Sequence, residues 1–327
     1  MNVGSGETMK NSDILRILYK NKGRYVSGQE MSDKFGISRA ALSKRVQKLR
    51  EGGNKIEAVT NKGYSLIDVP DEINQDNIYL GIDENQSIGG NIIFLNEVSS
   101  TNDYAKKTAK KSDSGTVVIA NVQTGGKGRR GRSFQSDEGG LYFTVILKPN
   151  VKIEEIPFLT QVTACAVYNA LFDFGVKSLI KWPNDIILNG KKLCGILCEM
   201  SMEIGMLNYC VVGIGINMYN KFDDELKKTA TSLSLENIKI SKKELFWKIL
   251  FYLEKYYKSF EDGKYEDMLK ILRTNSNIIG ERINIISAEK ITKATAIDID
   301  KRGFLQVEYD DGTKDALNYG EISIRKE

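Results

Sequence analysis

A short segment in which glycines alternate with cations is the part of this sequence best suited to chemistry. It runs from Gln123 to Phe134 as QTGGKGRRGRSF, and its cations are Lys127, Arg129, Arg130 and Arg132. Glycine lets backbone N–H groups approach a ligand closely, and the cations offset negative charge. The segment therefore predicts a loop that binds a phosphate or a phosphate ester. Composition alone leaves a solvated basic loop or a nucleic-acid arm open, and neither the P-loop nor the dinucleotide spacing fits.

Missing residue types narrow the chemistry further. The sequence has no histidine, which excludes Ser-His-Asp and Cys-His nucleophiles and zinc held by histidine. Cys194 and Cys198 would share one face of a strand, and no second cysteine pair completes a metal site. Both are predicted to be small buried residues. The chemistry must therefore rest on lysine, arginine, carboxylates, backbone amides and a hard metal ion.

Length, hydropathy and charge limit the class of protein. The 327 residues predict two or three domains, and a hydrophobic content of 41% suffices for buried cores. No apolar run is long enough to span a membrane, the start lacks a signal peptide, and four cysteines make no disulfide framework. We therefore expect a cytoplasmic protein without a membrane partner. Residues 1–69 carry 13 Lys and Arg against 7 Asp and Glu, a net charge of +6, whereas the remainder carries −2.

The basic N-terminal part has the pattern of a winged helix-turn-helix. Apolar residues at helical spacing predict a first helix from Ser12 to Asn21. Two further helices are expected after the caps Ser27 and Ser38, followed by short β runs at 56–59 and 64–67. The helix after Ser38 would enter the major groove of DNA, and the tip of the hairpin would reach the backbone. The predicted DNA-binding residues are Ser38, Arg39, Ser43, Lys44, Gln47 and Lys62. Winged helices also mediate protein contacts, but the local charge favours DNA.

The rest of the chain alternates strands with a few helices. A polar linker is expected at 68–90, and strands at 91–98, 117–122, 141–147, 179–181, 186–188, 192–198 and 209–218. Helices are expected at 101–111 and 156–174, and a third opens at Ser241 and Glu244. Asn189-Gly190 predicts a two-residue type I′ turn. From residue 278 onward, short β runs separated by glycine turns predict a small barrel.

Five motifs together resemble one family. They are the basic loop, KWPND (181–185), KKLCGIL (191–197), GIGINM (213–218) and the ending GEISIR (320–325). They closely resemble the biotin protein ligases, and the N-terminal part is similar to the branch that joins biotin ligase and biotin operon repressor in one chain. The resemblance covers essentially the whole sequence. It implies an α+β fold, with a winged helix-turn-helix at 1–70, a linker and mixed-sheet α/β catalytic domain of the biotin/lipoate ligase type at 71–277, and an SH3-like small β-barrel at 278–327.

The resemblance also implies roles for individual residues. Catalytic roles go to Lys192, Asp185 and Arg129, and Asp185 is also the candidate magnesium ligand. The expected biotin contacts are Ser100, Thr101, Asn102, Gln123, Gly126, Lys127, Gly128, Arg129, Lys192 and Gly195. The expected ATP and adenylate contacts are Arg130, Arg132, Phe134, Asn184, Asn217 and Arg325. Two positions depart from the family: Lys127 replaces an arginine and loses its bidentate fork, and Phe134 stands where tryptophan is common.

The implied activity has an enzymatic half and a regulatory half. Biotin and ATP, with Mg²⁺, would form biotinyl-5′-AMP, and biotin would then pass to a lysine of a biotin carboxyl carrier protein, as in acetyl-CoA carboxylase. The adenylate would also act as corepressor of biotin genes, by favouring a homodimer on operator DNA. Two alternatives stay open, a lipoate-type ligase and a biotin-sensing repressor without ligase activity. The basic loop and the N-terminal domain favour biotin, and intact Lys192 and Asp185 favour activity.

Overall fold

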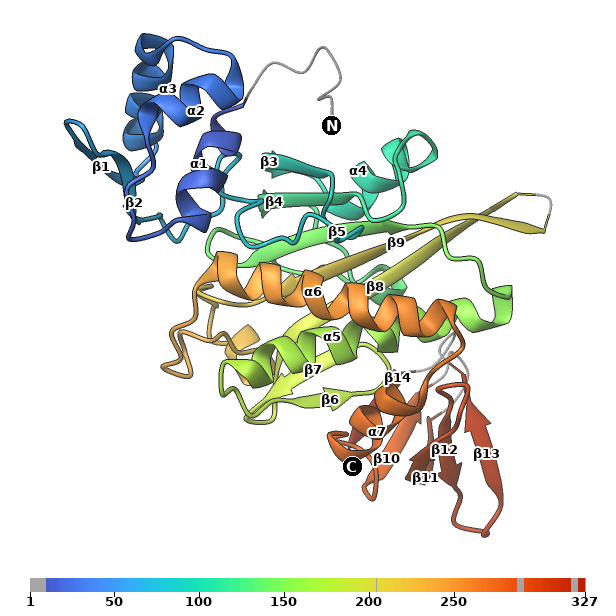
Figure 1. The fold of residues 1–327 in the computed structure, drawn as a ribbon. Coiled ribbons are helices and arrows are strands. Elements are labelled where there is room, and N and C mark those ends of the chain that lie inside the picture. The colour runs from blue at the N-terminus through green and yellow to red at the C-terminus, as the bar shows by residue number, and fades with distance from the viewer. Residues whose placement is uncertain (1–9, 204, 287–290, 319–322, 327) are drawn as a thin grey trace. The chain divides into compact units, whose positions relative to one another are not determined.

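Two compact units make up the computed structural model, which describes residues 10–203, 205–286, 291–318 and 323–326. One unit contains the N-terminal part up to Ile82 together with Ser241–Lys243, and the other contains the rest of the chain. The predicted fold class is confirmed: helices with a hairpin come first, a mixed sheet with helices follows, and an antiparallel sheet ends the chain (Figure 1).

The N-terminal unit has the element order predicted for a winged helix-turn-helix. Its elements are α1 (Asn11–Lys20), α2 (Gly28–Phe35), α3 (Arg39–Glu51), β1 (Lys55–Val59) and β2 (Gly63–Asp68). The hydroxyls of Ser27 and Ser38 cap α2 and α3 by accepting hydrogen bonds from the N–H groups of Glu30 and Ala41. The buried core consists of Ile14, Leu15, Leu18, Met31, Leu42, Val46, Leu49 and Leu66. Because α3 packs through this apolar stripe, its polar face is left exposed.

The hairpin of this unit turns through backbone that favours glycine. Asn61 and Gly63 have φ angles of 66° and 105°. A Cβ atom at Gly63 would also overlap the carbonyl oxygen of Val26, whose backbone pairs with Tyr64. Glycine is therefore required at position 63 to dock the hairpin beside the start of α2.

The segment predicted to be a polar linker contains the boundary between the two units, and it packs apolar side chains that its average polarity did not indicate. Ile73, Ile78, Leu80 and Ile82 are buried, and the guanidinium of Arg16 donates to the carbonyl oxygen of Ile82 over 2.9 Å. These four side chains are scattered among many polar ones. The low mean hydropathy of the segment therefore did not indicate that part of it is buried.

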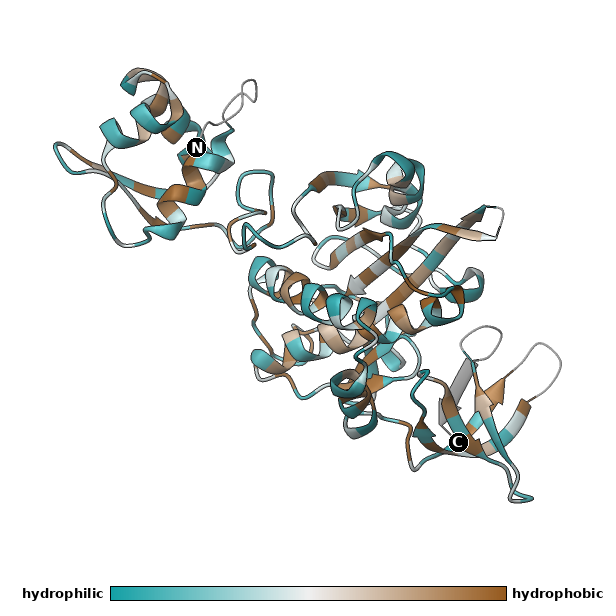
Figure 2. Ribbon diagram, turned by 45° about the vertical axis from the view of Figure 1, so that its right-hand side comes forward, coloured by the Kyte–Doolittle hydropathy of each residue, from teal (hydrophilic) through white to brown (hydrophobic). Residues whose placement is uncertain are grey.

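A mixed seven-stranded sheet is the centre of the second unit, in the order β3-β4-β5-β9-β8-β7-β6. Its strands are β3 (Ile92–Val98), β4 (Val117–Gln123), β5 (Leu141–Leu147), β6 (Leu179–Lys181), β7 (Asp185–Leu188), β8 (Lys191–Glu203) and β9 (Met206–Ile216). β3 and β4 are parallel, and the other neighbours are antiparallel. Every residue of β5 is buried, and the strands around it are largely hydrophobic (Figure 2).

Helices cover both faces of this sheet. On one face α4 (Thr101–Thr108) packs Ala105 against Val118, Ile146 and Val211. On the other lie α5 (Leu159–Asp173) and α6 (Lys242–Glu261), and Phe246 of α6 meets Phe143 of β5 edge to face at 5.1 Å (Figure 1). The helices predicted at 101–111, 156–174 and after Ser241 are confirmed, with short 3-10 turns η1 (Ala109–Lys111) and η3 (Ile153–Phe158) beside α4 and α5.

The structure extends the predicted strands and adds a helix. Asn189 and Gly190 both have positive φ, as the predicted type I′ turn requires. β8 and β9 remain paired as far as Glu203 and Met206, whereas the sequence predicted strands only at 192–198 and 209–218. The helix α7 (Glu266–Thr274) was not predicted. It is short, with nine residues, and burial of Met268, Leu269 and Leu272 stabilises it through tertiary packing.

The C-terminal part is a five-stranded antiparallel sheet in the order β13-β12-β11-β10-β14. Its strands are β10 (Arg282–Ile286), β11 (Ile291–Ile299), β12 (Leu305–Glu308), β13 (Lys314–Leu317) and β14 (Ser323–Lys326). The turn before β12 contacts α5 and the turn after β6: the carbonyl oxygen of Gly303 accepts hydrogen bonds from Gln161 Nε2 of α5 and from Trp182 Nε1. Within the described residues, no helix has the length and hydropathy needed to cross a bilayer.

Gly63→Ala is expected to destabilise the hairpin of the N-terminal unit by about 1–3 kcal/mol, because alanine would be strained at this φ and would overlap Val26. Hydrogen exchange of the β1 and β2 amides in the native chain measures this local free energy. Gly52→Ala is the matched control, since Gly52 has φ −75° and its added Cβ would lie 3.4 Å from the nearest atom. Equal exchange in the two variants would contradict the assignment.

Candidate functional site

The basic loop, the N-terminus of α4 and the facing strands β8 and β9 enclose one cleft. It contains about 480 Å³ of empty space, counting the part open to solvent, which suits a small-molecule ligand. The predicted site residues that line it are Ser100, Thr101, Asn102, Gln123, Lys127, Gly128, Arg129, Phe134, Asn184, Lys192 and Gly195. The structure therefore brings together most of the residues that the sequence singled out. They come from distant segments: Asn102 Nδ2, for example, donates to the carbonyl oxygen of Leu197, 95 residues further along the chain.

An ion pair joins Lys192, which lines this cleft, to Asp185. The ammonium group of Lys192, near the start of β8, is 2.6 Å from Oδ1 of Asp185, the first residue of β7. The ammonium also lies 5.8 Å from the ring centroid of Phe134, within cation–π range. Asp185 thus holds a lysine ammonium in a fixed position beside the cleft.

Glycines form the floor of the cleft where strands and side chains approach closely. Gly195 of β8 pairs directly with Gly215 of β9. A Cβ atom at Gly195 would lie 2.9 Å from Lys192 Cε, and one at Gly215 would lie 2.7 Å from the ring of Phe134. A Cβ at Gly213 would overlap the amide of Asn102. The absence of side chains on this floor therefore makes room for the side chains of Lys192 and Phe134.

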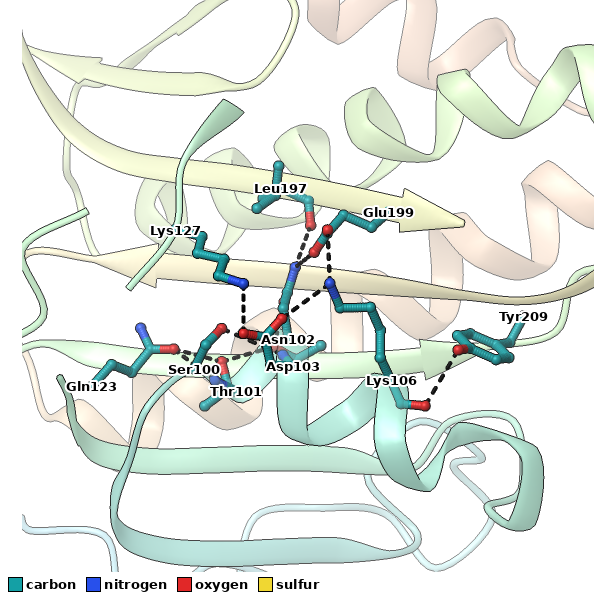
Figure 3. A network of polar contacts seen from close by, with 11 residues as sticks. Ser100, Thr101, Asn102, Asp103, Lys106, Gln123, Lys127, Leu197, Glu199 and Tyr209 are labelled. Atoms are coloured by element: carbon teal, nitrogen blue, oxygen red, sulfur yellow. Dashed lines mark hydrogen bonds and ion pairs between the residues drawn. The ribbon is translucent and has the colours of Figure 1, made fainter. Parts of the chain in front are cut away.

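A buried polar cluster forms the wall beside α4 (Figure 3). The backbone N–H and the hydroxyl of Thr101 both donate to Gln123 Oε1, at 2.8 and 3.0 Å. Thr144 Oγ1, from the centre of β5, lies 2.6 Å from Asn102 Oδ1 and 2.8 Å from Thr101 Oγ1. Because these groups hold one another, the hydroxyl and amide side chains are preorganised before any ligand arrives.

Arg129 also lines the cleft and is held by Asn184. Its Nη1 donates to Asn184 Oδ1 over 3.2 Å, and Asn184 Nδ2 donates to the carbonyl oxygen of Ile196 over 3.0 Å. Burial is the main cause that lowers the pKa of the Arg129 guanidinium, while Asp185 acts in the opposite direction. An arginine that starts from so high a pKa remains a cation at neutral pH.

Some predicted site residues do not line the cleft. Among the side chains that the structure describes, they are Gly126, Arg130, Arg132, Asp185 and Asn217. Arg130 and Arg132 are exposed, and Asn217 is buried with its amide nitrogen donating to the carbonyl oxygen of Thr231 over 3.0 Å. A Cβ at Gly126 would overlap Phe134 O, so this glycine serves the shape of the loop. Arg325 lies in β14, but its side chain is outside the described residues.

Several residues of the site escaped the sequence analysis. Thr144 was one, although a single threonine inside the apolar strand LYFTVIL was a usable signal. Ser136, whose hydroxyl accepts from Gln123 Nε2 over 2.9 Å, was another. Asp103, Lys106 and Glu199 form an ion-pair network next to the cleft, and nothing local in the sequence indicates that the last two meet.

The donor atoms of the site do not suit a resident metal ion. Among the described residues, no three His, Cys, Asp or Glu side chains are grouped to hold one. Asp185, the predicted ligand, already uses Oδ1 in the pair with Lys192. Magnesium can be held by one or two carboxylates when phosphates and waters supply the other ligands. These residues therefore fit magnesium that enters with a nucleotide.

The N-terminal unit presents a separate polar surface on α3. Arg39, Ser43 and Gln47 follow one another at intervals of four residues and are exposed, as is Lys44. Lys62, at the tip of the hairpin, is exposed and lies 5.7 Å from the ring of Tyr25. Ser38 caps the helix through its hydroxyl. The predicted residues thus lie on α3 and the hairpin in the arrangement that a recognition helix and wing require.

Comparison with known families assigns each part of the chain. The HTH domain matches residues 10–65, the Biotin/lipoate A/B protein ligase family matches residues 94–217, and the Biotin protein ligase C terminal domain matches residues 278–325. Fold and site thus define a biotin/lipoate-type protein ligase preceded by a helix-turn-helix domain.

Similarity extends over almost the full length of curated relatives. The chain is 34% identical to the bifunctional ligase/repressor BirA of Bacillus subtilis (strain 168), over 92% of this chain and 95% of that protein. It is 30% identical to the protein of the same name from Escherichia coli (strain K12), over 93% and 94%. The chain belongs to the family of these bifunctional ligase/repressor proteins.

A solved structure supports the same fold. The biotin protein ligase from Aquifex aeolicus in complex with biotin and ATP is 28% identical and has a TM-score of 0.64. The match covers 72% of this chain and 99% of that one.

Thr144→Val is expected to lower the free energy of unfolding by about 1–3 kcal/mol, because the buried amide oxygen of Asn102 would lose its hydroxyl partner. Chemical denaturation measures the change. Thr163→Val is the matched control, since this fully buried threonine donates to the carbonyl oxygen of Leu159 within α5, away from the cleft. A smaller loss for Thr144→Val than for the control would contradict the assigned network.

Proposed function

We propose that this protein is an ATP-dependent biotin ligase that also regulates transcription. The ligase half rests on one observation above all, the Lys192–Asp185 ion pair at a cleft lined by Lys127 and Arg129. The Aquifex aeolicus relative was solved with biotin and ATP, which supports these two molecules as the substrates here. Magnesium would enter bound to ATP.

Adenylation is the first half-reaction. A carboxylate oxygen of biotin attacks the α-phosphorus of ATP, the bond to the departing pyrophosphate breaks, and biotinyl-5′-AMP forms. Two anions must meet, so nearby cations lower the barrier. Lys192, Lys127 and Arg129 supply this charge, and Asp185 keeps Lys192 in place.

Transfer is the second half-reaction. The amine of a lysine on a biotin carboxyl carrier protein attacks the acyl carbon, the acyl–oxygen bond breaks, and AMP leaves with the electron pair. The attacking nitrogen releases its proton to solvent. Asp185 is the carboxylate suited to attract the incoming ammonium group, and the basic loop shields the mixed anhydride from water.

Lys192→Ala is expected to slow adenylation about 10²–10³-fold, because a positioned donor at the developing charge contributes about 2.7–4 kcal/mol. Pyrophosphate release with biotin and MgATP measures the rate. Lys191→Ala, at the neighbouring position of β8, is the control and should retain most of the activity. An unchanged rate in Lys192→Ala would refute the catalytic assignment.

A transfer assay separates the proposed biotin ligase from the two alternatives, a lipoate-type ligase and a biotin sensor without ligase activity. The purified chain is given MgATP, an acceptor carrier domain and either biotin or lipoate, and acceptor mass is followed. Biotin transfer supports the proposal, and lipoate transfer without biotin transfer would favour a lipoate-type ligase. Biotin binding without transfer would favour a biotin sensor that has lost ligase activity.

The regulatory half rests on the exposed polar face of α3. An HTH domain match and relatives named ligase/repressor support DNA as the partner of this face. One small recognition helix binds DNA modestly, whereas two copies on adjacent half-sites gain through effective concentration. Biotinyl-AMP would act as corepressor by binding better to a dimer-competent state.

Arg39→Ala and Lys44→Ala are each expected to weaken specific DNA binding about tenfold or more, since a base or phosphate contact contributes about 1–3 kcal/mol. DNA duplexes selected from a random pool by the wild-type chain with biotinyl-AMP provide the probe. Lys22→Ala, on the α1–α2 connection, is the charge-matched control.

In the wild-type chain, biotinyl-AMP should raise both DNA affinity and sedimenting mass. If DNA affinity and sedimenting mass are the same with and without biotinyl-AMP, the regulatory half of the proposal is refuted.

A further inference from the structure

A chain of ion pairs connects the basic loop to α4 and then to β8 (Figure 3). Lys127 Nζ of the loop lies 2.6 Å from Asp103 Oδ2, and Lys106 Nζ lies 3.0 Å from Asp103 Oδ1. Lys106 also contacts Glu199 Oε1 of β8 at 2.9 Å. Each carboxylate is thus held between two donors.

The far end of this network is anchored in the wall of the cleft. Glu199 Oε2 accepts a 2.8 Å hydrogen bond from Asn102 Nδ2, and Asn102 exposes only 4% of its surface. An isolated surface ion pair contributes little, but linked charges fixed to a buried group hold a defined geometry. The exposed fractions of the Asp103 and Lys106 side chains are 27% and 33%, and that of Lys127 is 49%, so solvent screens the Lys127 end of the network more than the rest.

Two side-chain contacts hold the loop to separate segments of the chain. Arg129 contacts Asn184, which precedes β7, and Lys127 contacts Asp103 of α4. Lys127 lines the cleft, whereas Asp103 does not. An ammonium group has three donors, so Lys127 can keep Asp103 as a partner while it donates to a bound anion.

The charge state of the network suits neutral pH. The hydrogen bond from Lys127 is the main reason that the pKa of Asp103 is lowered; burial opposes it, and Lys106 adds to it. Burial acts to lower the pKa of Lys106, but bonds to Glu199 and Asp103 outweigh it and raise the pKa. A lowered carboxyl pKa makes the ionised pair stabilising above the ordinary Asp range, and that contribution is lost only as pH falls below it.

We propose that Asp103 is a positioning residue that holds the basic loop over the cleft through Lys127, and that this ion pair sets how slowly biotinyl-AMP escapes. The second clause rests on the proposed ligase function, whereas the first concerns the chain alone. The pairing is possible here because position 127 carries a compact ammonium that meets one carboxylate oxygen and leaves the other to Lys106.

The loop-holding step is tested without any ligand. Amide hydrogen exchange of residues 124–132 is measured in the full-length wild-type chain and in Asp103→Asn, which keeps the shape of the side chain and removes its charge. Exchange in the loop is expected to accelerate about tenfold in Asp103→Asn. Unchanged exchange would overturn the proposal, whatever the enzyme assays give.

The matched control removes another ion pair between the α4–η1 segment and β8, at a point that does not contact the loop. Lys110 in η1 and Glu203 in β8 form an ion pair at 3.3 Å, so Glu203→Gln removes a similar contact without touching the loop. Loop exchange in Glu203→Gln should equal that of the wild type. Equal acceleration in both variants would mean that any lost α4–β8 pair loosens the loop, and would overturn the specific role of Asp103.

Adenylate escape is tested by pyrophosphate kinetics without an acceptor. One equivalent of pyrophosphate should appear in a burst, followed by a slow steady rate set by loss of biotinyl-AMP. Asp103→Asn is expected to leave the burst rate within about twofold and to raise the steady rate about five- to tenfold. Steady release from the wild type without a burst would overturn the escape step. No pyrophosphate release at all would refute the ligase function instead, and the exchange data would still decide the loop-holding step.

A double variant shows whether Asp103 acts through Lys127. If it does, Asp103→Asn should add nothing to the steady rate of Lys127→Met, and added salt should speed escape in the wild type only. A full additional increase in the double variant would mean that Asp103 acts through the first turn of α4, which would overturn the proposal.

Discussion

Mutual repulsion among cations is the constraint on which the site depends. Lys127, Arg129 and Lys192 line one cleft, and without a ligand they would repel one another and favour an open loop. The fold gives each a partner on its own side: Asp103, Asn184 and Asp185. The cleft is therefore rich in positive charge and still ordered, which lets it receive two anionic substrates without first rearranging.

Backbone geometry supports this arrangement from below. Gly195 and Gly215 are cross-strand partners, so two neighbouring strands lack side chains at the same level of the sheet. Phe134 and Lys192 occupy the space thus left. A chain without histidine can in this way concentrate charge, an aromatic ring and buried amides around one small volume.

Sequence reasoning succeeded where residues act through local motifs. The loop, the Lys192 region and the caps at Ser27 and Ser38 are contiguous patterns, and the structure agrees with them. It failed where partners come from distant segments. Lys106 and Glu199 are 93 residues apart, and their pairing depends on how α4 crosses β8 and β9. Asn217 looked available in its motif, yet the fold turns its amide toward the carbonyl oxygen of Thr231. Strand register and helix placement decide such contacts, and neither is written in a local pattern.

The carbonyl oxygen of Gly303 is shared by two deeply buried donors, Trp182 Nε1 and Gln161 Nε2. Trp182 lies three residues before Asp185, so a turn of the C-terminal sheet buttresses the segment that carries a catalytic candidate. Losing this acceptor inside the protein would cost about 1–3 kcal/mol for each donor. The C-terminal sheet is therefore not an interchangeable module. Grafting a C-terminal sheet from a relative would keep these two hydrogen bonds only where the grafted turn presents a backbone carbonyl at the same point.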